Sequence, residues 1–501
     1  MPSGPPNVVV IVLDCVRASD FPGSGPNPAA MPFCESLAKE SVIFPKAVSP
    51  SPWTLPSHAS LFSGLQPWET GCHWKGNLQL PASTPRLASA LRSRGYRTYA
   101  MSANPLLSPT FNVFEGFDRA GWAEWWEPYL RFGKGGLPAH QVPEESARAS
   151  SWLSRVRVGP IDAMVKRSVG LFYKHPVVLD AGSRFIQGLN DEAERPDISI
   201  ARWIEPTVAQ WVNDTPISTP IHLFVNLLEA HEPYFSIRGL AHGPSALWAY
   251  LRARQDNIGF LAGEWSPSAG ELDLLHDLYR VTLGALDRRV QAIVQVLKDS
   301  DRWENTLLIL TSDHGQAFGE HGFLFHMISI DDPVLRIPLW MRLPGGESGG
   351  SKGRGWATLI DVTPTVSRLT GMAEIHSPHA HSLVDLVDAE RPEPVVSISD
   401  GIPWSHFRRR FPEDRARTLD RPKVAAYEGD WKWILDDEAG PPALFDVRKD
   451  PMESSNLGSQ YAGRAGTLDR AAQTVAHVIK GSVPAQLAPD VDERLRAWGY
   501  V

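Results

Sequence analysis

Three long apolar runs dominate the pattern of hydrophobic and polar positions, and each is followed at once by polar residues. They span residues 7–13, 221–228 and 306–312, and they are rich in Val, Ile and Leu. Continuous runs of this length are typical of parallel strands that are covered on both faces. The first run is followed by Asp14, the second by residues 229–232 (EAHE) and the third by Asp313-His314. The pattern therefore predicts three buried strands with polar residues at their carboxyl ends.

Helical patterns alternate with these strands along the chain. We expect helices at residues 29–39, 87–94, 203–212 and 272–297, and shorter strands at 42–44 and 96–102. Gly95 stands where a helix C-terminus favours glycine. Alternation of strands and helices predicts an α/β fold with a mostly parallel sheet.

The segment 52–64, PWTLPSHASLFSG, is predicted to be a tight turn that leads into a helix ending at Gly64. Backbone N–H groups at a helix start favour anions such as phosphate or sulfate. Thr54 is therefore a candidate nucleophile. The alternative interpretation is that Thr54 or Ser57 only caps the helix.

Length, composition and charge narrow the class of protein. With 501 residues, 43% of them hydrophobic, the chain can form one large domain and a smaller one. The net charge of -8 argues against a general nucleic-acid binder. Three cysteines predict neither a disulfide framework nor a zinc ribbon, and they favour a reducing compartment. Because no apolar run is long enough for a membrane span or a signal segment, we expect a soluble, cytoplasmic protein.

Residues from about 122 to 195 interrupt the alternation. Tryptophans and basic side chains gather there, and between Arg148 and Lys174 the only acidic residue is Asp162. One interpretation is an inserted, mostly helical lid that contacts an anionic, partly apolar substrate or a membrane surface. The alternative is a helical insertion with an ordinary solvated face.

The polar strand ends are expected to converge, because the carboxyl ends of parallel strands share one edge of the sheet. Asp14, Asp313 and His314 are suitable ligands for a divalent cation, and the histidine favours manganese or zinc over calcium. A cation bound to the hydroxyl of Thr54 would favour its alkoxide. His231 and His326 are predicted to donate hydrogen bonds to developing charge, and either could be the general acid.

Several neighbours of these residues have alternative interpretations. Asp14 could cap a helix, and Cys15 is predicted to be a small buried hydrophobic residue, since the sequence shows no base beside it. Arg17 and Asp20 follow the first strand and could reach the site or lie at the surface. Glu229 is a possible weak participant.

At this point the sequence resembles the sulfatase branch of the alkaline phosphatase superfamily. The matching segments extend over most of the chain, namely residues 7–14, 52–64, 95–104, 231–234, 311–322, 334–338, 361–365, 444–446, 450–451 and 456–457. The resemblance implies an alkaline-phosphatase-like α/β sandwich with helices on both sides of the sheet. It also implies a small C-terminal α+β subdomain, with residues 423–435 and 443–447 in a short antiparallel sheet. We expect a catalytic domain at 1–375 and the subdomain at 376–501.

The departures from the family pattern are informative. Sulfatases carry Cys or Ser in a Cys/Ser-x-Pro-x-Arg motif that is oxidised to formylglycine, whereas this chain has Thr54 and, in place of the arginine, His58. A threonine cannot become that aldehyde, so no formylglycine is expected. Cys15 replaces one of the family's paired aspartates, and His326 stands near the position of a lysine. The set is more similar to threonine-nucleophile phosphoesterases and lipid-headgroup phosphotransferases, and Asp313-His314 is also similar to phosphonate monoester hydrolases.

The resemblance implies one divalent metal ion, with Mn or Zn favoured and Mg or Ca possible, bound by Asp14, Thr54, Asp313 and His314. A second ligand set of the Asp-x-x-x-His type is not seen in the sequence, so a dinuclear centre is not expected. The predicted function is hydrolysis of a small anionic phosphate or phosphonate ester through Thr54, with His58, His231 and His326 contacting the substrate. The alternatives are a phosphotransferase with an alcohol acceptor, a sulfuric ester hydrolase without formylglycine, and a non-catalytic binding protein. Substrate selection is expected in the insertion and in loops near 404–410, and the oligomeric state is left open.

Overall fold

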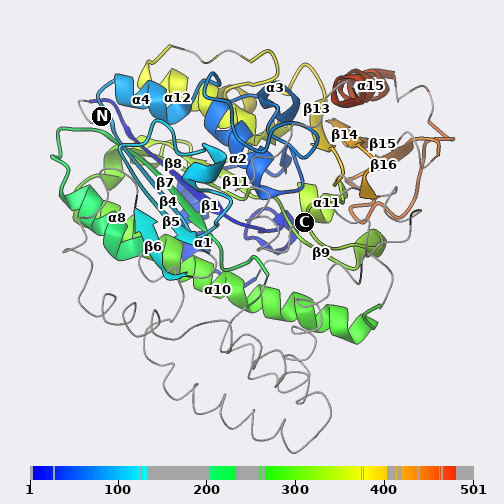
Figure 1. Cartoon of the computed structure of the whole chain (residues 1–501), viewed down its shortest axis with the longest axis horizontal. Helices are drawn as coiled ribbons and strands as arrows, with labels where there is room; N and C mark the ends of the chain where they lie inside the picture. The colour runs from blue at the N-terminus through cyan, green and yellow to red at the C-terminus, as the bar shows by residue number, and fades with distance from the viewer. Residues whose placement is uncertain are drawn as a thin grey trace, which may run out of the picture.

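An eight-stranded sheet forms the centre of the protein in the computed structural model (Figure 1). The structure describes residues 4–25, 29–124, 127–132, 204–232, 234, 260, 266–373, 375, 377–402, 413, 419–436, 440–461, 463 and 466–480. The strand order is β2 (Val42–Ile43), β11 (Leu339–Arg342), β8 (Thr306–Thr311), β1 (Asn7–Leu13), β7 (Ile221–Leu227), β4 (Arg97–Ser102), β5 (Arg119–Glu124) and β6 (Glu127–Phe132). The five central strands, β8 to β5 in this order, are parallel. The predicted α/β fold with a mostly parallel sheet is confirmed.

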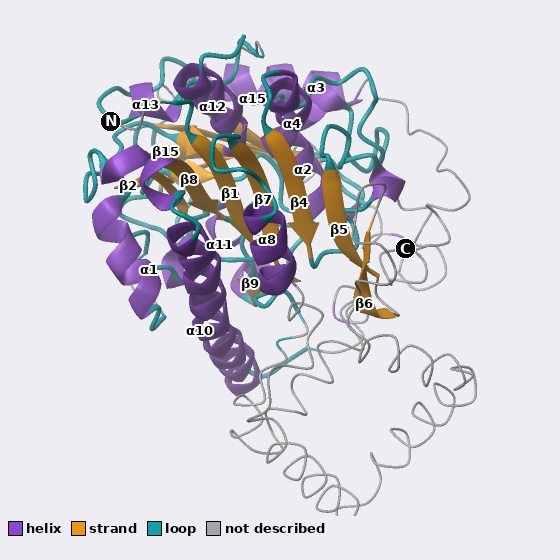
Figure 2. Ribbon diagram, turned by 90° about the vertical axis from the view of Figure 1, so that its left-hand side faces the viewer, coloured by secondary structure: helices purple, strands orange, loops and turns teal. Residues whose placement is uncertain are grey.

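Helices cover both faces of this sheet, as Figures 1 and 2 show. On one side lie helices α2, α4 and α12, and on the other lie α1, α8 and the long α10. The α-helices are α1 (Pro32–Leu37), α2 (Thr54–Ser63), α3 (Pro67–Thr70), α4 (Leu87–Ser93), α8 (Ile204–Asn213), α10 (Ala269–Asp299), α11 (Asp332–Leu335), α12 (Val362–Thr370), α13 (Leu383–Leu386) and α15 (Gly466–Lys480).

Short elements complete the described part of the chain. Two-stranded sheets pair β9 (Ala317–Phe318) with β10 (Leu324–Phe325), and β3 (Ala47–Val48) with β12 (Ala357–Thr358). The 3-10 turns are η1 (Ala18–Asp20), η2 (Ala38–Glu40), η3 (Pro109–Phe111), η7 (Trp303–Asn305), η8 (Glu320–Gly322), η9 (Pro344–Gly346) and η10 (Leu359–Asp361).

Strand β1 shows why the apolar runs are continuous. Val8, Val10 and Val12 pack in the core beneath α2, α4 and α12. Val9 and Ile11 pack with α8 and α10 on the opposite face. Successive side chains of a strand point to opposite faces, so a strand buried on both sides needs apolar residues at every position. All seven residues of β1 are buried, as the sequence predicts.

The C-terminal subdomain contains a four-stranded antiparallel sheet. Its strands are β13 (Val395–Ser399), β14 (Lys423–Glu428), β15 (Trp431–Leu435) and β16 (Ala443–Asp446), in that order, and α15 packs against it. Strand β13 contacts the segment before α2, since Ser397 Oγ donates to Ser49 O at 2.6 Å and Ile398 N donates to Pro50 O at 2.9 Å. The small antiparallel sheet is confirmed, and the boundary near residue 375 stays a prediction.

Two local predictions differ from the structure. The helix expected at 29–39 begins at Pro32 and is followed after Leu37 by a 3-10 turn, because proline is suited to the first helical turn. The helical insertion expected from residue 122 begins instead with strands β5 and β6. Backbone pairing with β4 extends the sheet there despite the polar composition. The rest of the predicted insertion, 133–195, and the loop at 404–410 lie outside the described residues.

Candidate active site

The polar residues that follow four parallel strands meet at one edge of the sheet. Register places Leu13 of β1 beside Leu227 of β7, and Ser102 of β4 beside Asn226. Val12 of β1 pairs with Thr311 of β8 on the other side. The residues just beyond these positions therefore lie together, and the predicted convergence of Asp14, Asp313 and His314 is seen in the structure.

Helix α2 presents Thr54 to this edge as its first residue. Trp53 precedes it with extended backbone and makes no side-chain cap, and Gly64 ends the helix with a φ of 72°. A Cβ at Gly64 would lie 2.8 Å from Cβ of Thr363, so the close packing of α12 also requires glycine there. Trp53 holds the N-cap position, so Thr54 does not cap the helix, and its hydroxyl lies 3.3 Å from Nε2 of His314. The capping alternative is wrong for Thr54.

Asp14 is fully buried and is held by two asparagines. Its Oδ2 accepts hydrogen bonds from Nδ2 of Asn104 at 2.9 Å and from Nδ2 of Asn226 at 3.1 Å. Asn104 Nδ2 also lies 3.3 Å from Thr54 Oγ1. Asn104 therefore joins the carboxylate and the hydroxyl that sequence analysis assigns to one metal ion. Asp14 Oδ2 thus accepts hydrogen bonds from side-chain amides and not from backbone N–H groups at a helix start, so these contacts are not those of a helix cap.

Asp313 has one satisfied and one unsatisfied carboxylate oxygen. Oδ1 accepts from the backbone N–H of Cys15 at 3.2 Å and of His314 at 2.9 Å. Oδ2 is buried without a hydrogen bond, 3.4 Å from Nε2 of His314 and 3.6 Å from Nδ1 of His58. Buried carboxylate oxygens are normally paired. Asp313 Oδ2 is therefore free to bind a cation. It lies near two further potential ligand atoms, Nε2 of His314 and the hydroxyl oxygen of Thr54.

His58 is buried between Phe62 and Phe224, and its Nδ1 lies 2.9 Å from the carbonyl oxygen of Thr54. Its Nε2 has no hydrogen-bond partner. In this arrangement His58 supports the first turn of α2 and the carboxylate of Asp313. The predicted contact of His58 with substrate stays a prediction.

His231 and His326 form a second group on the other side of His314. The rings of His231 and His326 lie 4.9 Å apart, and His326 stacks on His314 at 4.5 Å. Nδ1 of His326 lies 2.9 Å from Gln316 Oε1, and Gln316 Nε2 donates to Glu232 Oε2 at 2.6 Å. Both histidines therefore face the site from the loops after β7 and β10.

Cys15 belongs to this second group as well. It is buried, as expected, but its Sγ lies 3.7 Å from Nδ1 of His326 and 3.3 Å from Oδ1 of Asp14. The prediction of a simple hydrophobic residue is therefore incomplete, because tertiary structure brings a base beside the thiol. Burial, followed by the charges of Asp14 and Glu232, raises the pKa of the Cys15 thiol well above its usual value.

The pKa values of the two carboxylates in the site are shifted in opposite directions. Burial and the neighbouring charge of Asp14 raise the pKa of Asp313 to about 7. For Asp14, burial raises the pKa, but His231, His314 and the Asn104 hydrogen bond outweigh it, and the pKa is lowered. The negative charge of Asp14 therefore favours protonation of Asp313.

The histidines also differ in protonation. Burial lowers the pKa of His314, and burial with the charge of His314 lowers the pKa of His326 well below the ordinary value. For His231, burial lowers the pKa, but Glu232 and Asp14 raise it by more, so the net shift is upward. The lowered pKa values favour the neutral form of His326 and His314, and the raised pKa favours the protonated form of His231.

Three other charged residues that the sequence suggested as candidates form ion pairs outside the site. Glu229 forms an ion pair with Arg289 of α10 at 2.7 Å. Asp20 pairs with Arg280 at 2.8 Å, and Arg17 pairs with Glu320 at 2.9 Å. These charges connect the sheet edge to α10 and η8 and do not join the site.

Sequence reasoning assigned no role to Asn104, Asn226, Glu232 or Gln316. Asn104 and Asn226 contact Asp14 directly, and Gln316 connects Glu232 to His326. A usable signal existed for the asparagines, because both lie at or just beyond the end of a parallel strand. Uncharged amides are so common in loops and strands that this position alone does not identify them.

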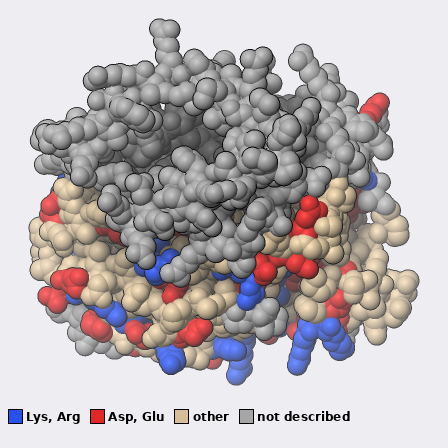
Figure 3. Space-filling model, turned by 90° about the horizontal axis from the view of Figure 1, so that it is seen from below, with Lys and Arg blue, Asp and Glu red and all other residues tan. Residues whose placement is uncertain are grey.

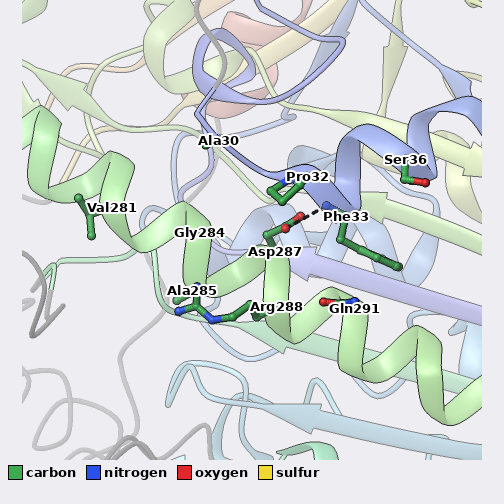
Figure 4. A pocket seen from close by; sticks show the side chains of 10 residues that line it. All are labelled: Ala30, Pro32, Phe33, Ser36, Val281, Gly284, Ala285, Asp287, Arg288 and Gln291. Atoms are coloured by element: carbon green, nitrogen blue, oxygen red, sulfur yellow. Dashed lines mark hydrogen bonds between the residues drawn. The ribbon is translucent and has the colours of Figure 1, made fainter. Parts of the chain in front are cut away.

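A separate surface cavity of 640 Å³ lies between α1 and α10 (Figure 4). Ten residues line it, including Pro32, Phe33 and Arg288, and none is a site residue named above. Asp287 accepts from the backbone N–H of Phe33 at 3.0 Å and of Cys34 at 2.8 Å. This carboxylate satisfies the start of α1, so its role is structural.

The described surface on the face seen in Figure 3 carries acidic and basic side chains interspersed around its edge. No helix among the described residues combines the length and hydropathy that crossing a membrane requires.

Comparison with known proteins identifies the family. A family model described as Sulfatase matches residues 6–135 and 172–372, and the chain therefore belongs to the sulfatase family. Choline-sulfatase of Rhizobium meliloti is 25% identical over 487 residues, which cover 92% of this chain and 84% of that protein. Arylsulfatase K of Danio rerio is 22% identical, with 94% and 83% covered. The protein is an ester-bond hydrolase of the alkaline phosphatase superfamily.

Solved structures share the fold over nearly the whole chain. Phosphonate monoester hydrolase of Agrobacterium radiobacter has a TM-score of 0.62 at 19% identity, and 95% of this chain and 96% of that chain are covered. A structure described as bound to its substrate D-glucosamine-2-N,6-O-disulfate has a TM-score of 0.65 at 15% identity, with 96% and 99% covered. These likenesses confirm the predicted alkaline-phosphatase-like sandwich.

Proposed function

We propose that this protein is a metal-dependent hydrolase of small anionic phosphate or phosphonate esters, with Thr54 as the nucleophile. The observation that carries the proposal is the placement of the Thr54 hydroxyl. It lies at the first residue of α2, 3.3 Å from His314 Nε2 and 3.3 Å from Asn104 Nδ2. A hydroxyl that only stabilised the helix would accept from a backbone N–H instead.

The residues around Thr54 fit one divalent cation. Asp14, Asp313 and His314 supply carboxylate oxygens and a neutral imidazole nitrogen, and Oδ2 of Asp313 is buried without a hydrogen bond. Oxygen ligands with one imidazole suit Mn²⁺ or Zn²⁺, while Mg²⁺ and Ca²⁺ prefer oxygen alone. A bound cation would favour the alkoxide of Thr54 and polarise an ester oxygen.

The chain's own groups can perform the remaining steps. Thr54 Oγ1, after its proton has passed to solvent, forms a bond to phosphorus while the bond from phosphorus to the leaving oxygen breaks. His231, whose pKa is raised, donates its proton to that oxygen. Water then attacks the phosphothreonine and gives a proton to His231, while the bond from phosphorus to Thr54 Oγ1 breaks and Thr54 is regenerated as its alkoxide. The neutral His326 is placed to donate a hydrogen bond to the transferred group.

Thr54 also decides how this chain differs from a formylglycine sulfatase. A threonine carries a methyl group on the carbon that bears its hydroxyl, so oxidation cannot produce an aldehyde. We therefore propose chemistry without formylglycine.

Sulfate esters are the second candidate substrates. The relatives named choline-sulfatase and arylsulfatase K support this alternative. Sulfate and phosphate monoesters share tetrahedral geometry and anionic oxygens, and the cation and histidines can contact both. Transfer to an alcohol acceptor, peripheral membrane contact and a cytoplasmic location remain proposals.

The test compares wild-type protein with Thr54→Val and Thr54→Ser on aryl phosphate, phosphodiester, phosphonate and sulfate substrates. Each assay is repeated with Mn²⁺, Zn²⁺, Mg²⁺ and Ca²⁺ added to metal-free protein. Valine keeps the shape of threonine without its hydroxyl, so kcat is expected to fall at least about 10³-fold, while serine keeps activity within about 10-fold. Near-normal turnover by folded Thr54→Val on the best substrate would show that the mechanism is wrong.

A further inference from the structure

Four potential metal ligands form a compact cluster beside the first metal-ligand set. Cys15, His231, Glu232 and His326 each offer one ligand atom, and these atoms all lie within 4.8 Å of one another. Cys15 follows β1, His231 and Glu232 follow β7, and His326 follows β10. We refer to these four residues as the cysteine-histidine cluster.

The spacing of the cluster is close to that of a tetrahedral zinc site. Ligand atoms about 2.0 to 2.3 Å from zinc lie about 3.3 to 3.6 Å from one another in a tetrahedron. Nδ1 of His326 lies 3.7 Å from Cys15 Sγ and 3.7 Å from Glu232 Oε2. Nδ1 of His231 lies 3.6 Å from the same Glu232 oxygen. These three pairs need a contraction of a few tenths of an ångström at most to reach zinc distances, and the remaining pairs lie within 4.8 Å.

The backbone of Cys15 holds its thiol in this cluster. Cys15 has a φ of 64°, a conformation that residues other than glycine, asparagine and aspartate seldom adopt. Its N–H donates to Asp313 Oδ1 at 3.2 Å, and its carbonyl oxygen accepts from the Tyr279 hydroxyl at 3.2 Å. The surrounding structure therefore maintains an unfavourable conformation that places Sγ next to His326.

Gln316 orients two members of the cluster. Its Nε2 donates to Glu232 Oε2 at 2.6 Å, and its Oε1 lies 2.9 Å from His326 Nδ1. Metal-binding carboxylates and imidazoles are commonly held by outer hydrogen-bonding groups. On metal binding, His326 Nδ1 would exchange its contact with Gln316 for the cation.

We propose that the cysteine-histidine cluster binds a second divalent cation of the zinc class next to the first. One thiolate, two imidazoles and one carboxylate favour zinc over magnesium or calcium. Binding breaks the S–H bond of Cys15 and the Nδ1–H bond of His231, which donates to the carbonyl oxygen of Glu232 in the metal-free protein. A sulfur–metal bond and a nitrogen–metal bond form, and two protons are released to solvent. The single-metal expectation from the sequence would then be incomplete.

This inference rests on the proposed function, in which the neighbouring Asp14, Asp313 and His314 bind the first cation. It changes the role of His231 in the proposed mechanism. With the second cation bound, Nδ1 of His231 is a ligand and its remaining N–H donates only a hydrogen bond. A cation held by these residues would offset negative charge on the leaving oxygen in place of the His231 proton.

Cobalt provides a probe of the cluster that does not depend on activity. Metal-free protein is titrated with Co²⁺, and thiolate-to-cobalt absorption in the near ultraviolet is recorded with the bound stoichiometry. Wild-type protein is expected to bind two equivalents and to show the thiolate band. Cys15→Ala should bind one equivalent without the band. The matched control Cys34→Ala, which removes a buried thiol of α1, should retain both equivalents and the band.

The outcomes separate this inference from the proposed function. Absence of the band in wild-type protein that binds cobalt overturns the second site, and so does a band that persists in Cys15→Ala. If Cys15→Ala does not fold, Glu232→Gln provides the same test. The expected result is a thiolate band of altered energy or intensity, and an unchanged band would contradict the second site. Thr54→Val should lose turnover and keep the band, so loss of one property without the other identifies which proposal is wrong.

Discussion

The hydroxyl of Thr54 lies 3.3 Å from Nε2 of His314, although 260 positions of sequence separate the two residues. Helix α2 carries the first and the end of β8 carries the second. The contact depends on β8 lying next to β1 and on α2 packing over the face of the sheet that Val8, Val10 and Val12 form. Substitution of Thr54 or of His314 therefore tests the same contact, once from α2 and once from the end of β8.

Metal removal is expected to abolish turnover. The proposed ligands of the cation are Asp14, Asp313 and His314, and the mechanism needs the cation to activate Thr54. Chelation should therefore leave folded, inactive protein whose activity returns with Mn²⁺ or Zn²⁺. His314→Ala should lower metal affinity at least about 10-fold, measured by competition with a chromophoric chelator. His379→Ala, in the loop before α13, is the matched control. Full activity of thoroughly chelated protein would contradict the metal-dependent mechanism.

Asn104 is predicted to position both Asp14 and Thr54. Replacing it with alanine removes hydrogen bonds of 2.9 Å to Asp14 Oδ2 and 3.3 Å to Thr54 Oγ1. We expect kcat/KM or metal affinity to fall about 10- to 100-fold, with a smaller effect on stability. Asn305→Ala, at the opposite end of β8, is the control. Equal kinetics for Asn104→Ala and wild-type protein would exclude this positioning role.

His222 is predicted to make stability depend on pH. Burial lowers its pKa from 6.5 to about 4 in the folded chain, so the unfolded chain binds the proton more tightly. The stability contribution is complete above pH 6.5 and is lost as the pH falls toward 4, by roughly 3 kcal/mol. Denaturant unfolding between these pH values should show a shallower slope for His222→Asn than for wild-type protein. A wild-type slope in His222→Asn would contradict the assignment.

Lys432 is predicted to stabilise the junction between the C-terminal sheet and α11. Its fully buried Nζ lies 3.0 Å from Asp332 Oδ1 and 2.8 Å from Ile330 O, and it also pairs with Glu453. Lys432→Met would leave two buried carboxylates without their cation, at a cost of about 3 to 5 kcal/mol in the free energy of unfolding. The exposed Lys449→Met should cost less than about 1 kcal/mol. Equal unfolding free energies for the two variants would contradict the prediction.

The sequence by itself determined the central strands and the polar residues that meet at their carboxyl ends. Apolar runs covered on both faces identify β1, β7 and β8 without any alignment, because a doubly buried strand has no polar alternation. Their parallel order then predicts that Asp14, Asp313 and His314 meet. Thr54 was identifiable because prolines and Gly64 delimit its helix.

Only the tertiary structure decided which polar side chains contact one another. The asparagines that hold Asp14 are ordinary amides in sequence, and their role depends on the register of β4 and β7 beside β1. Likewise, Cys15 appears apolar until its left-handed backbone and the loop after β10 place Sγ beside His326. Strand formation follows from local burial patterns, whereas these contacts join residues up to 311 positions apart. Their distances depend on how all the layers pack, which no local pattern records.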